Sequence, residues 1–339
     1  MMKRSFILMA MLFSVLFIVA CSNKKAVHNE ESEKEDASDA LQTTIIGGRT
    51  GGAWSVFTEG VAESIRRENK GAVVTVEPGG IVENPPAVGT NLVPYGITYS
   101  MTAYAAYTGT EPYPKAYEDI RAISVIVPGN YYQFVVRSDA PYNSIDEIVE
   151  NKIPIRLSVN QQGSAGEIIT KNILHEYGIT YENIVDWGGA IENLSDVKTY
   201  ELMADKRIDA NGNAVSIPSS GIIEASTTTD LKMLSFNKEV LQAVSNDLGM
   251  EIGTIKAGSY DFLQDDIDTL FTPAILIVHK DVPDEEVYQI TKAIYNNFEF
   301  LGTVHEEFKN LTADNMMEVG QVPLHPGAEK FFKKAGMLD

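Results

Sequence analysis

The chain has 339 residues and a formal net charge of −20 at pH 7, from 47 acidic and 27 basic side chains. An acidic surface repels phosphate backbones, which excludes nucleic acid as a partner. A small anionic ligand is not excluded, because nearby donors act locally whereas distant charges are screened beyond roughly 10 Å.

The first residues have the pattern of an export signal. Lys3 and Arg4 precede the apolar run Ile7–Ala20, which is too short for an ordinary membrane span. The run ends in small residues before Cys21, a pattern typical of a bacterial lipobox in which the cysteine is acylated. A plain signal peptide with an incidental cysteine is the alternative. We therefore expect a signal peptide at 1–20 and an extracytoplasmic protein, lipid-anchored to the cell membrane or on the periplasmic side in a double-membrane cell.

Residues 21–40 are charged or small and almost free of apolar side chains. Such a segment cannot bury a core, so we expect a flexible acidic tether after the lipidated Cys21. Because Cys21 is the only cysteine, an intrachain disulfide and a Cys/His zinc site are excluded. Folding is expected to start near Leu41, and the remaining length suits one large domain or two lobes.

From Thr43 onwards, short apolar runs alternate with helical patterns, which predicts an α/β fold with largely parallel sheets. Apolar residues at spacings of three and four predict helices across Trp54–Ile65, Ile169–Tyr177 and, after Pro283, Val287–Leu301. The predicted strands are Thr43–Ile46, Ala72–Val76, Tyr95–Tyr99, Ala122–Val127, Gln133–Val136, Ile155–Val159 and Ala274–Val278.

Two segments about 110 residues apart share one plan. "TTIIGGRTGGAWSVFTEGV" (43–61) and "IRLSVNQQGSAGEIITKNI" (155–173) each run from a strand through a loop of small residues into a helix. Such a loop directs unpaired backbone N–H groups and the positive end of a helix at the carboxyl edge of its strand. The repetition predicts two similar lobes whose anion-favouring loops face one cleft.

Catalytic and nucleotide motifs are not met. A G-x-G-x-x-G reading from Gly47 finds Arg49 at its third position, and a Walker loop from Gly47 finds Ala53 in place of lysine. "QGSAG" misses the hydrolase elbow because its first residue is Gln162, and none of the five histidines forms H-E-x-x-H. We therefore expect no cofactor, no metal site and no catalytic set.

The remaining chemistry is that of a binding cleft. Arg49 and Arg137 are candidate carboxylate clamps, because a guanidinium group binds carboxylate with two parallel bonds, although either could instead form a surface ion pair. Aromatic residues near predicted strand ends fit a mostly apolar pocket or, alternatively, serve as core and loop anchors. They are Trp54, Tyr99, Tyr104, Tyr107, Tyr131 and Tyr132.

Several motifs resemble one family in the same order. "GGRTGGAW" (47–54), "GGIVEN" (79–84) and "YSMTAYAAYTG" (99–109) resemble segments of the TRAP-associated extracytoplasmic immunogenic (TAXI) family of solute receptors. "FVVRSDAPYNSIDEI", "GSAGE", "TPAILIVHKDVPDEEVYQITKAIYNN" and "PLHPGAEKFFKKAG" follow, so that the match covers about residues 41–337. On these motifs the chain is identified as a member of that family.

The resemblance implies a type II periplasmic-binding-protein fold, with two α/β lobes and a ligand cleft between them. Lobe one would comprise 41–131 plus 272–339, and lobe two 132–271, with crossings near Asn130–Phe134 and Leu270–Ala274. The implied function is a lipid-anchored receptor, not an enzyme, that delivers a small carboxylate such as glutamate, glutamine or 2-oxoglutarate to ion-coupled TRAP-type membrane permease subunits. Alternatives are a sensor of the same fold that signals to a membrane kinase, or an exported enzyme.

The resemblance also implies a set of ligand contacts, carried over by position. They are Thr50, Gly51, Trp54, Gly80, Asn84, Ser100, Tyr104, Tyr131, Tyr132, Gln133, Gly163, Ser164 and Ala165.

The chain departs from the family pattern at some of these loops. Ile81 and Met101 replace a serine and an aspartate, and Ala165-Gly166 replaces Gly-Thr. Asn211-Gly212-Asn213 stands where an apolar strand is usual. It is either a distorted loop or a strand that turns an asparagine, with Asn213 as the candidate contact, into the cleft.

Overall fold

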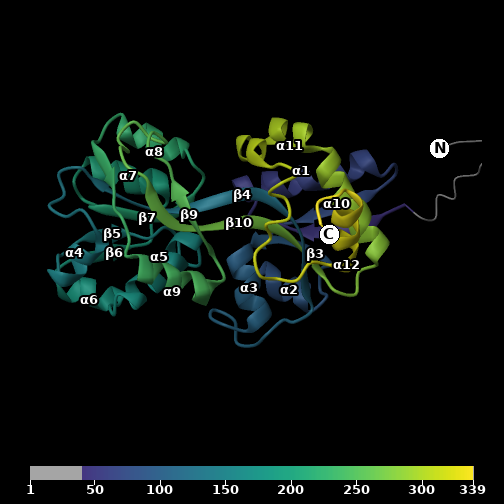
Figure 1. Cartoon of the computed structure of the whole chain (residues 1–339), viewed down its shortest axis with the longest axis horizontal. Coiled ribbons are helices and arrows are strands. Elements are labelled where there is room, and N and C mark those ends of the chain that lie inside the picture. The colour runs from purple at the N-terminus through teal and green to yellow at the C-terminus, as the bar shows by residue number, and fades with distance from the viewer. Residues whose placement is uncertain (1–39, 339) are drawn as a thin grey trace, which may run out of the picture. The chain divides into compact units, whose positions relative to one another are not determined.

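The computed structural model describes residues 40–338, which are built around one ten-stranded sheet (Figure 1). The strand order is β2-β1-β3-β10-β4-β7-β5-β6, with β8 paired to β4 and β9 paired to β10. The predictions for the signal peptide, Cys21 and the tether before residue 40 lie outside the described residues. The strands are β1 (Gln42–Ile46), β2 (Val73–Glu77), β3 (Tyr95–Tyr99), β4 (Ile120–Arg137), β5 (Arg156–Ser158), β6 (Ala190–Glu192), β7 (Ala210–Val215), β8 (Leu231–Met233), β9 (Glu251–Ile255) and β10 (Ile267–His279).

The sheet is parallel at its two ends and antiparallel in the middle. β1 pairs in parallel with β2 and β3, and β5 pairs in parallel with β6 and β7, as the strand–helix alternation predicts. The central pairs β3–β10, β10–β4 and β4–β7 are antiparallel, so the prediction of a largely parallel sheet is wrong there. The reason is that β4 carries the chain from one half of the sheet to the other and β10 carries it back alongside.

The predicted strands Ala122–Val127 and Gln133–Val136 are two parts of the single strand β4. Between them lie Pro128 and Gly129, a pair that usually indicates a turn. Gly129 has a φ of 66°, and the chain continues through a register irregularity in its pairing with β10 instead of turning back. A β-bulge therefore replaces the expected break.

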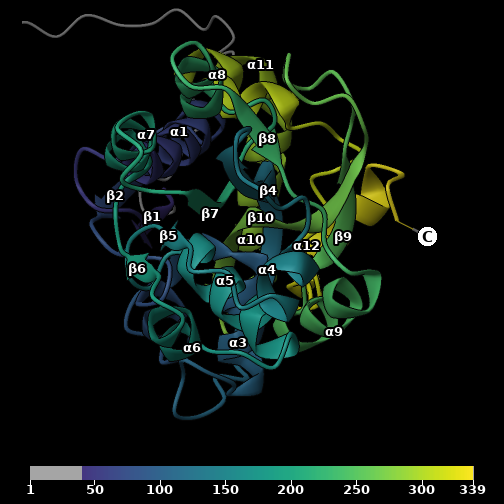
Figure 2. The same ribbon diagram turned by 90° about the vertical axis from the view of Figure 1, so that its left-hand side faces the viewer.

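Helices cover both faces of the sheet. In both views α1, α8 and α11 lie on one side, whereas α3, α6 and α9 lie on the other (Figures 1 and 2). The helices are α1 (Ala53–Glu68), α2 (Asn84–Gly89), α3 (Ser100–Thr108), α4 (Ile145–Glu150), α5 (Ala165–Glu176), α6 (Tyr181–Asp186), α7 (Asp196–Ala204), α8 (Ser220–Ser226), α9 (Lys238–Leu248), α10 (Asp284–Asn296), α11 (Phe298–Val304), the 3₁₀ helix η1 (Glu306–Asn310) and α12 (Pro326–Lys334).

The helix predictions hold with one exception. Phe57, Val61 and Ile65 form the buried face of α1, as their spacing predicts. The segment predicted as one helix to Leu301 is instead two, α10 and α11, with the break at Asn297. The Asn297 side chain donates to the carbonyl of Ala293 at 2.8 Å, a local bond that competes with the helix ladder. No helix within residues 40–338 has both the length and the apolar character needed to cross a membrane.

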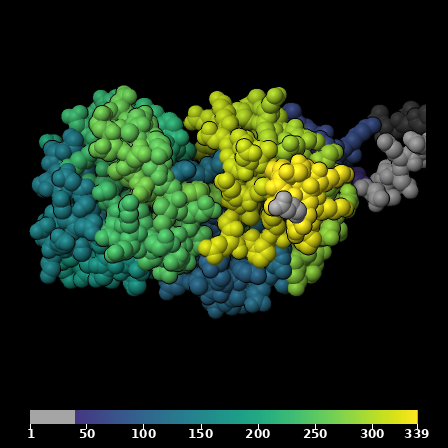
Figure 3. All heavy atoms as spheres, viewed as in Figure 1, coloured from purple at the N-terminus to yellow at the C-terminus, as the bar shows by residue number. Residues whose placement is uncertain are grey.

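The two halves of the sheet are each surrounded by their own helices. On the surface, teal and green atoms from the β5–β7 half lie at one end, and dark blue and yellow atoms from the β1–β3 half lie at the other (Figure 3). β4 and β10 are common to both halves. The carboxyl ends of β1 and β5 therefore lead into loops that can meet between the halves.

Candidate functional site

A cavity of about 1030 Å³ lies between these loops, and both halves of the sheet contribute to its lining. Its location at the carboxyl ends of parallel strands is where open α/β sheets usually bind ligands. Both of the repeated loops predicted from the sequence line it. The lining residues are 48–54, Phe57, 79–83, Tyr99, 111–112, Asn130, 160–165, 167–168, 171–172, 213–215, Ala274 and Glu307.

The loop from β1 to α1 brings an uncapped helix end to the cavity. Gly52 is the N-cap of α1, it offers no side-chain cap, and the first turn holds no acidic residue. Gly51 has a φ of 84°, which favours glycine, and a Cβ on Gly48 would lie 2.2 Å from that of Trp54. The positive end of this 16-residue helix is therefore open to an anion.

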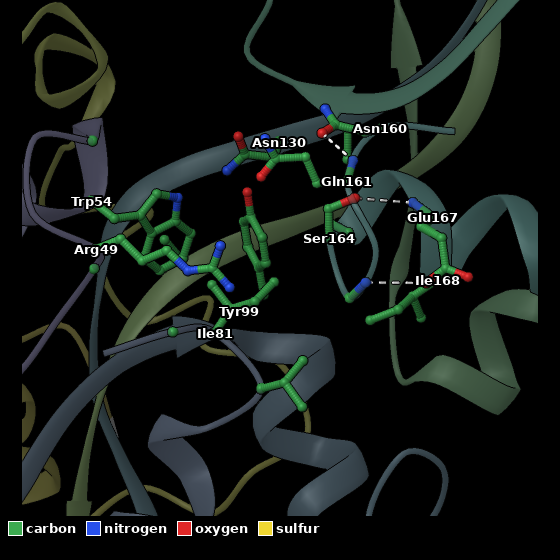
Figure 4. Close-up of a pocket in the computed structure, with 18 of the residues that line it drawn as sticks. Arg49, Trp54, Ile81, Tyr99, Asn130, Asn160, Gln161, Ser164, Glu167 and Ile168 are labelled. Atoms are coloured by element: carbon green, nitrogen blue, oxygen red, sulfur yellow. Dashed lines mark hydrogen bonds between the residues drawn. The ribbon is translucent and has the colours of Figure 1, made fainter. Parts of the chain in front are cut away.

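The loop from β5 to α5 has the same backbone plan but a different charge. Ser164 caps α5 by accepting the N–H of Glu167 at 3.3 Å. The Glu167 carboxylate in turn accepts the N–H of Gly163 at 3.3 Å (Figure 4). This helix end already has its own negative charge, so the two repeated loops are not equivalent anion sites.

The two candidate arginine clamps have different surroundings. Arg49 lines the cavity beside Tyr99 and, among the described residues, forms no ion pair and no side-chain hydrogen bond (Figure 4). Arg137 lies outside the lining, where its Nε donates to Asp139 at 3.0 Å and its Nη1 to Asp209 at 3.2 Å. Arg137 therefore fits the ion-pair alternative: Asp139 lies two residues along the chain, and Asp209 lies just before β7, a proximity that the sequence does not show.

Of the other predicted contacts, Thr50, Gly51, Trp54, Gly80, Gly163, Ser164, Ala165 and Asn213 line the cavity. Six lie outside the lining, namely Asn84, Ser100, Tyr104, Tyr131, Tyr132 and Gln133. Each of the six is engaged elsewhere in the fold.

Asn84 is fully buried and links three segments behind the cavity wall. Its Nδ2 donates to the carbonyls of Gly47 at 2.9 Å and Ile97 at 2.7 Å, and its Oδ1 accepts the N–H of Gly80 at 3.0 Å. Its amide therefore holds the cavity-lining loops and is not available to a ligand.

Ser100 is the first residue of α3, and Tyr104 lies one turn further along that helix. The Ser100 hydroxyl lies 3.0 Å from that of Thr272, and it is 2% exposed. The Tyr104 ring packs against Gly249, where an added Cβ would lie 2.4 Å from it. Both side chains pack α3 against its neighbours rather than facing the cavity.

The three predicted contacts of the crossing strand are engaged with other side chains of the protein. The hydroxyl of Tyr132 lies 2.7 Å from that of Thr170, and the hydroxyl of Tyr260 donates to Gln133 at 2.7 Å. Tyr131 stacks on an aromatic ring of β10, with centroids 5.0 Å apart. These three consecutive residues cover both faces of β4, so the choice of face does not explain the miss; it is the preceding residue, Asn130, that lines the cavity.

The Asn211–Asn213 segment is a regular part of β7, so the alternative of a distorted loop is wrong. Asn213 lines the cavity, but its Nδ2 donates to both carboxylate oxygens of Asp196, at 3.0 and 2.9 Å. Burial raises the pKa of Asp196, although the bonds from Asn211 and Asn213 oppose that effect. A side chain at Gly212 would meet the Tyr132 hydroxyl at 2.5 Å, which accounts for the glycine.

An aromatic wall stands beside Arg49. Trp54 and Tyr99 meet edge to face with ring centroids 4.8 Å apart. Burial, and secondarily the charge of Glu307, raises the pKa of Tyr99, so its phenol stays neutral. Burial also raises the pKa of Glu307 itself.

Several lining residues were not predicted as contacts. Asn160 and Gln161 belong to the repeated loop and Lys171 to the helix α5 that follows it, so they could have been included from their position. Glu83 lies in the "GGIVEN" segment. Asn130 lies in the predicted crossing Asn130–Phe134, next to the predicted contact Tyr131, but was not itself predicted as a contact. Glu307 carried no sequence signal. No three His, Cys, Asp or Glu side chains within residues 40–338 are placed to hold a metal ion.

The structure is similar to known solute-binding folds. PhnD1 from Prochlorococcus marinus in complex with methylphosphonate matches with a TM-score of 0.52 and 11% identity, over 88% of this chain and 99% of that chain. XAC2383 from Xanthomonas citri bound to chloride ion matches with a TM-score of 0.50 and 11% identity, over 87% and 97%. The periplasmic binding protein BugD matches with a TM-score of 0.48 and 14% identity, over 88% and 98%.

The mixed sheet and its cavity thus match the fold of the periplasmic solute-binding proteins, as predicted. The chain belongs to the NMT1-like family, whose sequence model matches residues 45–336. The narrower assignment to the TAXI family is not reached by this match and stays a prediction.

Proposed function

We propose that this protein is an extracytoplasmic, lipid-anchored receptor that binds a small carboxylate in the cavity and delivers it to membrane permease subunits of the TRAP type. The observation that carries the proposal is Arg49, whose guanidinium group has no partner among the described residues and lies beside the uncapped end of α1. A carboxylate there gains charge-assisted hydrogen bonds and the favourable helix dipole together.

The proposed mechanism is closure of two lobes, residues 41–131 plus 272–339 and residues 132–271, around the ligand. β4 and β10 connect the halves, and the cavity lining comes from both. A ligand that contacts both lobes favours the closed state by its differential affinity for that state. Binding without turnover suffices for this role, and we propose no catalytic residue.

Thermal shift with a panel of amino acids and dicarboxylates tests the proposal. A ligand at 100 times its Kd should stabilise the folded protein by about 2.7 kcal/mol. The Arg49→Ala variant should lose that shift and keep the melting temperature of the free protein. Arg207→Ala, at an exposed arginine outside the lining, is the matched control and should keep the shift. A shift with neutral sugars alone, or equal shifts in both variants, would contradict the proposal.

A further inference from the structure

The bulge in β4 determines where Asn130 lies. In the pairing of β4 with β10, Asn130 lies opposite Thr272 and Val127 lies opposite Ala274. The two pairs are three residues apart along β4 but only two apart along β10. One extra residue is therefore accommodated in β4, next to Gly129 with its φ of 66°. Bulges of this kind change the direction of the side chains that follow them, and they are frequent beside binding sites.

Asn130 is a buried amide without a partner. It is 7% exposed, it lines the cavity, and no hydrogen bond of its side chain is formed to any of the described residues. Figure 4 shows Asn130 and Tyr99 facing the same part of the cavity. The polar atoms of the Asn130 amide are not enclosed by protein but open into the cavity, so they are available to a polar group of a ligand.

The cavity has one unpaired positive group. Of its two basic side chains, Arg49 is free, whereas Lys171 lies 3.7 Å from the carboxylate of Glu111. The N-terminus of α5 is already occupied by Glu167. Arg49 is therefore the one lining cation without a carboxylate partner among the described residues, whereas Lys171, 61% exposed, forms only a weak surface pair with Glu111, 93% exposed.

The rest of the lining is acidic or neutral and polar. The lining has more carboxylates than basic groups, and more carboxamides than carboxylates. The carboxylates are those of Glu83, Glu111, Glu167 and Glu307. The carboxamides are those of Asn130, Asn160, Gln161, Gln162, Asn172 and Asn213. Carboxamides donate and accept at once, which suits neutral carbonyl, amide or hydroxyl groups.

We propose that the ligand carries a single carboxylate, held at Arg49 and the α1 terminus, and is otherwise neutral and polar, and that Asn130 selects it by bonding a neutral carbonyl, amide or hydroxyl group. This inference rests on the proposed function and narrows it, because it excludes dicarboxylates as preferred ligands. A second carboxylate adds negative charge to a lining that already has more acidic than basic side chains.

Four probes separate the effect of a charge at the far end of the ligand from the effect of an α-amino group. They are glutarate, glutarate monoamide, glutamate and glutamine. Titration calorimetry gives a Kd for each. The monoamide and glutamine should bind at least about tenfold more tightly than glutarate and glutamate, respectively. If glutarate and glutamate bound more tightly than their amides, and Arg49→Ala abolished that binding, the proposed function would stand and this inference would be overturned. Binding of none of the four would overturn this inference, and the proposed function would fall only if the wider panel of carboxylates also gave no shift.

Variants of Asn130 test its role directly. Asn130→Asp keeps the shape of the side chain and adds a charge, so it should weaken binding of the preferred probe by about tenfold or more. The control Asn246→Asp, at an exposed site, should change the Kd of that probe less than about twofold. Asn130→Leu should also weaken binding, yet it should not lower the melting temperature, because the amide has no partner in the free protein. A lower melting temperature with unchanged affinity would make Asn130 a structural residue and overturn the proposal.

Discussion

Replacing Asn84 by alanine should lower the free energy of unfolding by about 3–5 kcal/mol. The side chain is fully buried and forms three short hydrogen bonds, to the carbonyls of Gly47 and Ile97 and from the N–H of Gly80, at 2.7–3.0 Å. Each bond contributes about 1 kcal/mol net, and each buried carbonyl left without a donor adds a desolvation penalty of about 1–3 kcal/mol. The lower limit counts the bonds alone.

Urea denaturation followed by circular dichroism measures the change, which should appear as a lower midpoint at an unchanged slope. Asn84→Asp is a second variant, and it should destabilise further because it removes the donor and buries a charge. Asn151→Ala is the control, since this exposed residue forms one bond of the same kind, to the carbonyl of Glu147 at 2.9 Å, and should cost less than about 1 kcal/mol. Equal losses in Asn84→Ala and Asn151→Ala would refute the reasoning.

Three further variants probe the walls of the cavity. Gly212→Ala should destabilise by about 2–4 kcal/mol in urea denaturation, because its methyl group would disrupt the 2.7 Å contact between the hydroxyls of Tyr132 and Thr170; unchanged stability would mean that the strand can shift. Ser164→Ala should remove the α5 cap and about 1 kcal/mol of stability in the same assay, and a change below about 0.3 kcal/mol would count against that cap. For Glu307 burial raises the folded-state pKa, so the stability that it contributes is fully present below its ordinary value of 4.5 and is lost as pH rises through the folded value. Glu307→Gln should therefore gain stability relative to the parent protein between pH 4.5 and 7, measured as melting temperature against pH, and parallel profiles would contradict the pKa shift.

Local patterns were enough to predict the two loops of the site. The glycines after β1 and the small residues after β5 are contiguous in sequence, and each precedes a helix with a clear apolar face. Strand, loop and helix then follow from short-range preferences, so the loops were placed before the fold was known.

The remaining features depend on contacts between distant segments. Arg137 has one carboxylate partner two residues along the chain, Asp139, and the packing of β4 against the start of β7 adds Asp209, which no local pattern shows. Whether β4 and β10 run side by side is a property of the whole sheet, which alternation along the chain does not specify. Asn130 enters the cavity because of a bulge, and Glu307 comes from a 3₁₀ helix far along the chain.

The most direct test of the account is a crystal structure with the carboxylate that gives the largest thermal shift. We predict that its carboxylate lies within hydrogen-bond distance of the Arg49 guanidinium group and of backbone N–H groups at the start of α1, with a neutral polar group next to Asn130. A ligand whose carboxylate lies at the α5 terminus, or that binds outside the cavity, would contradict it.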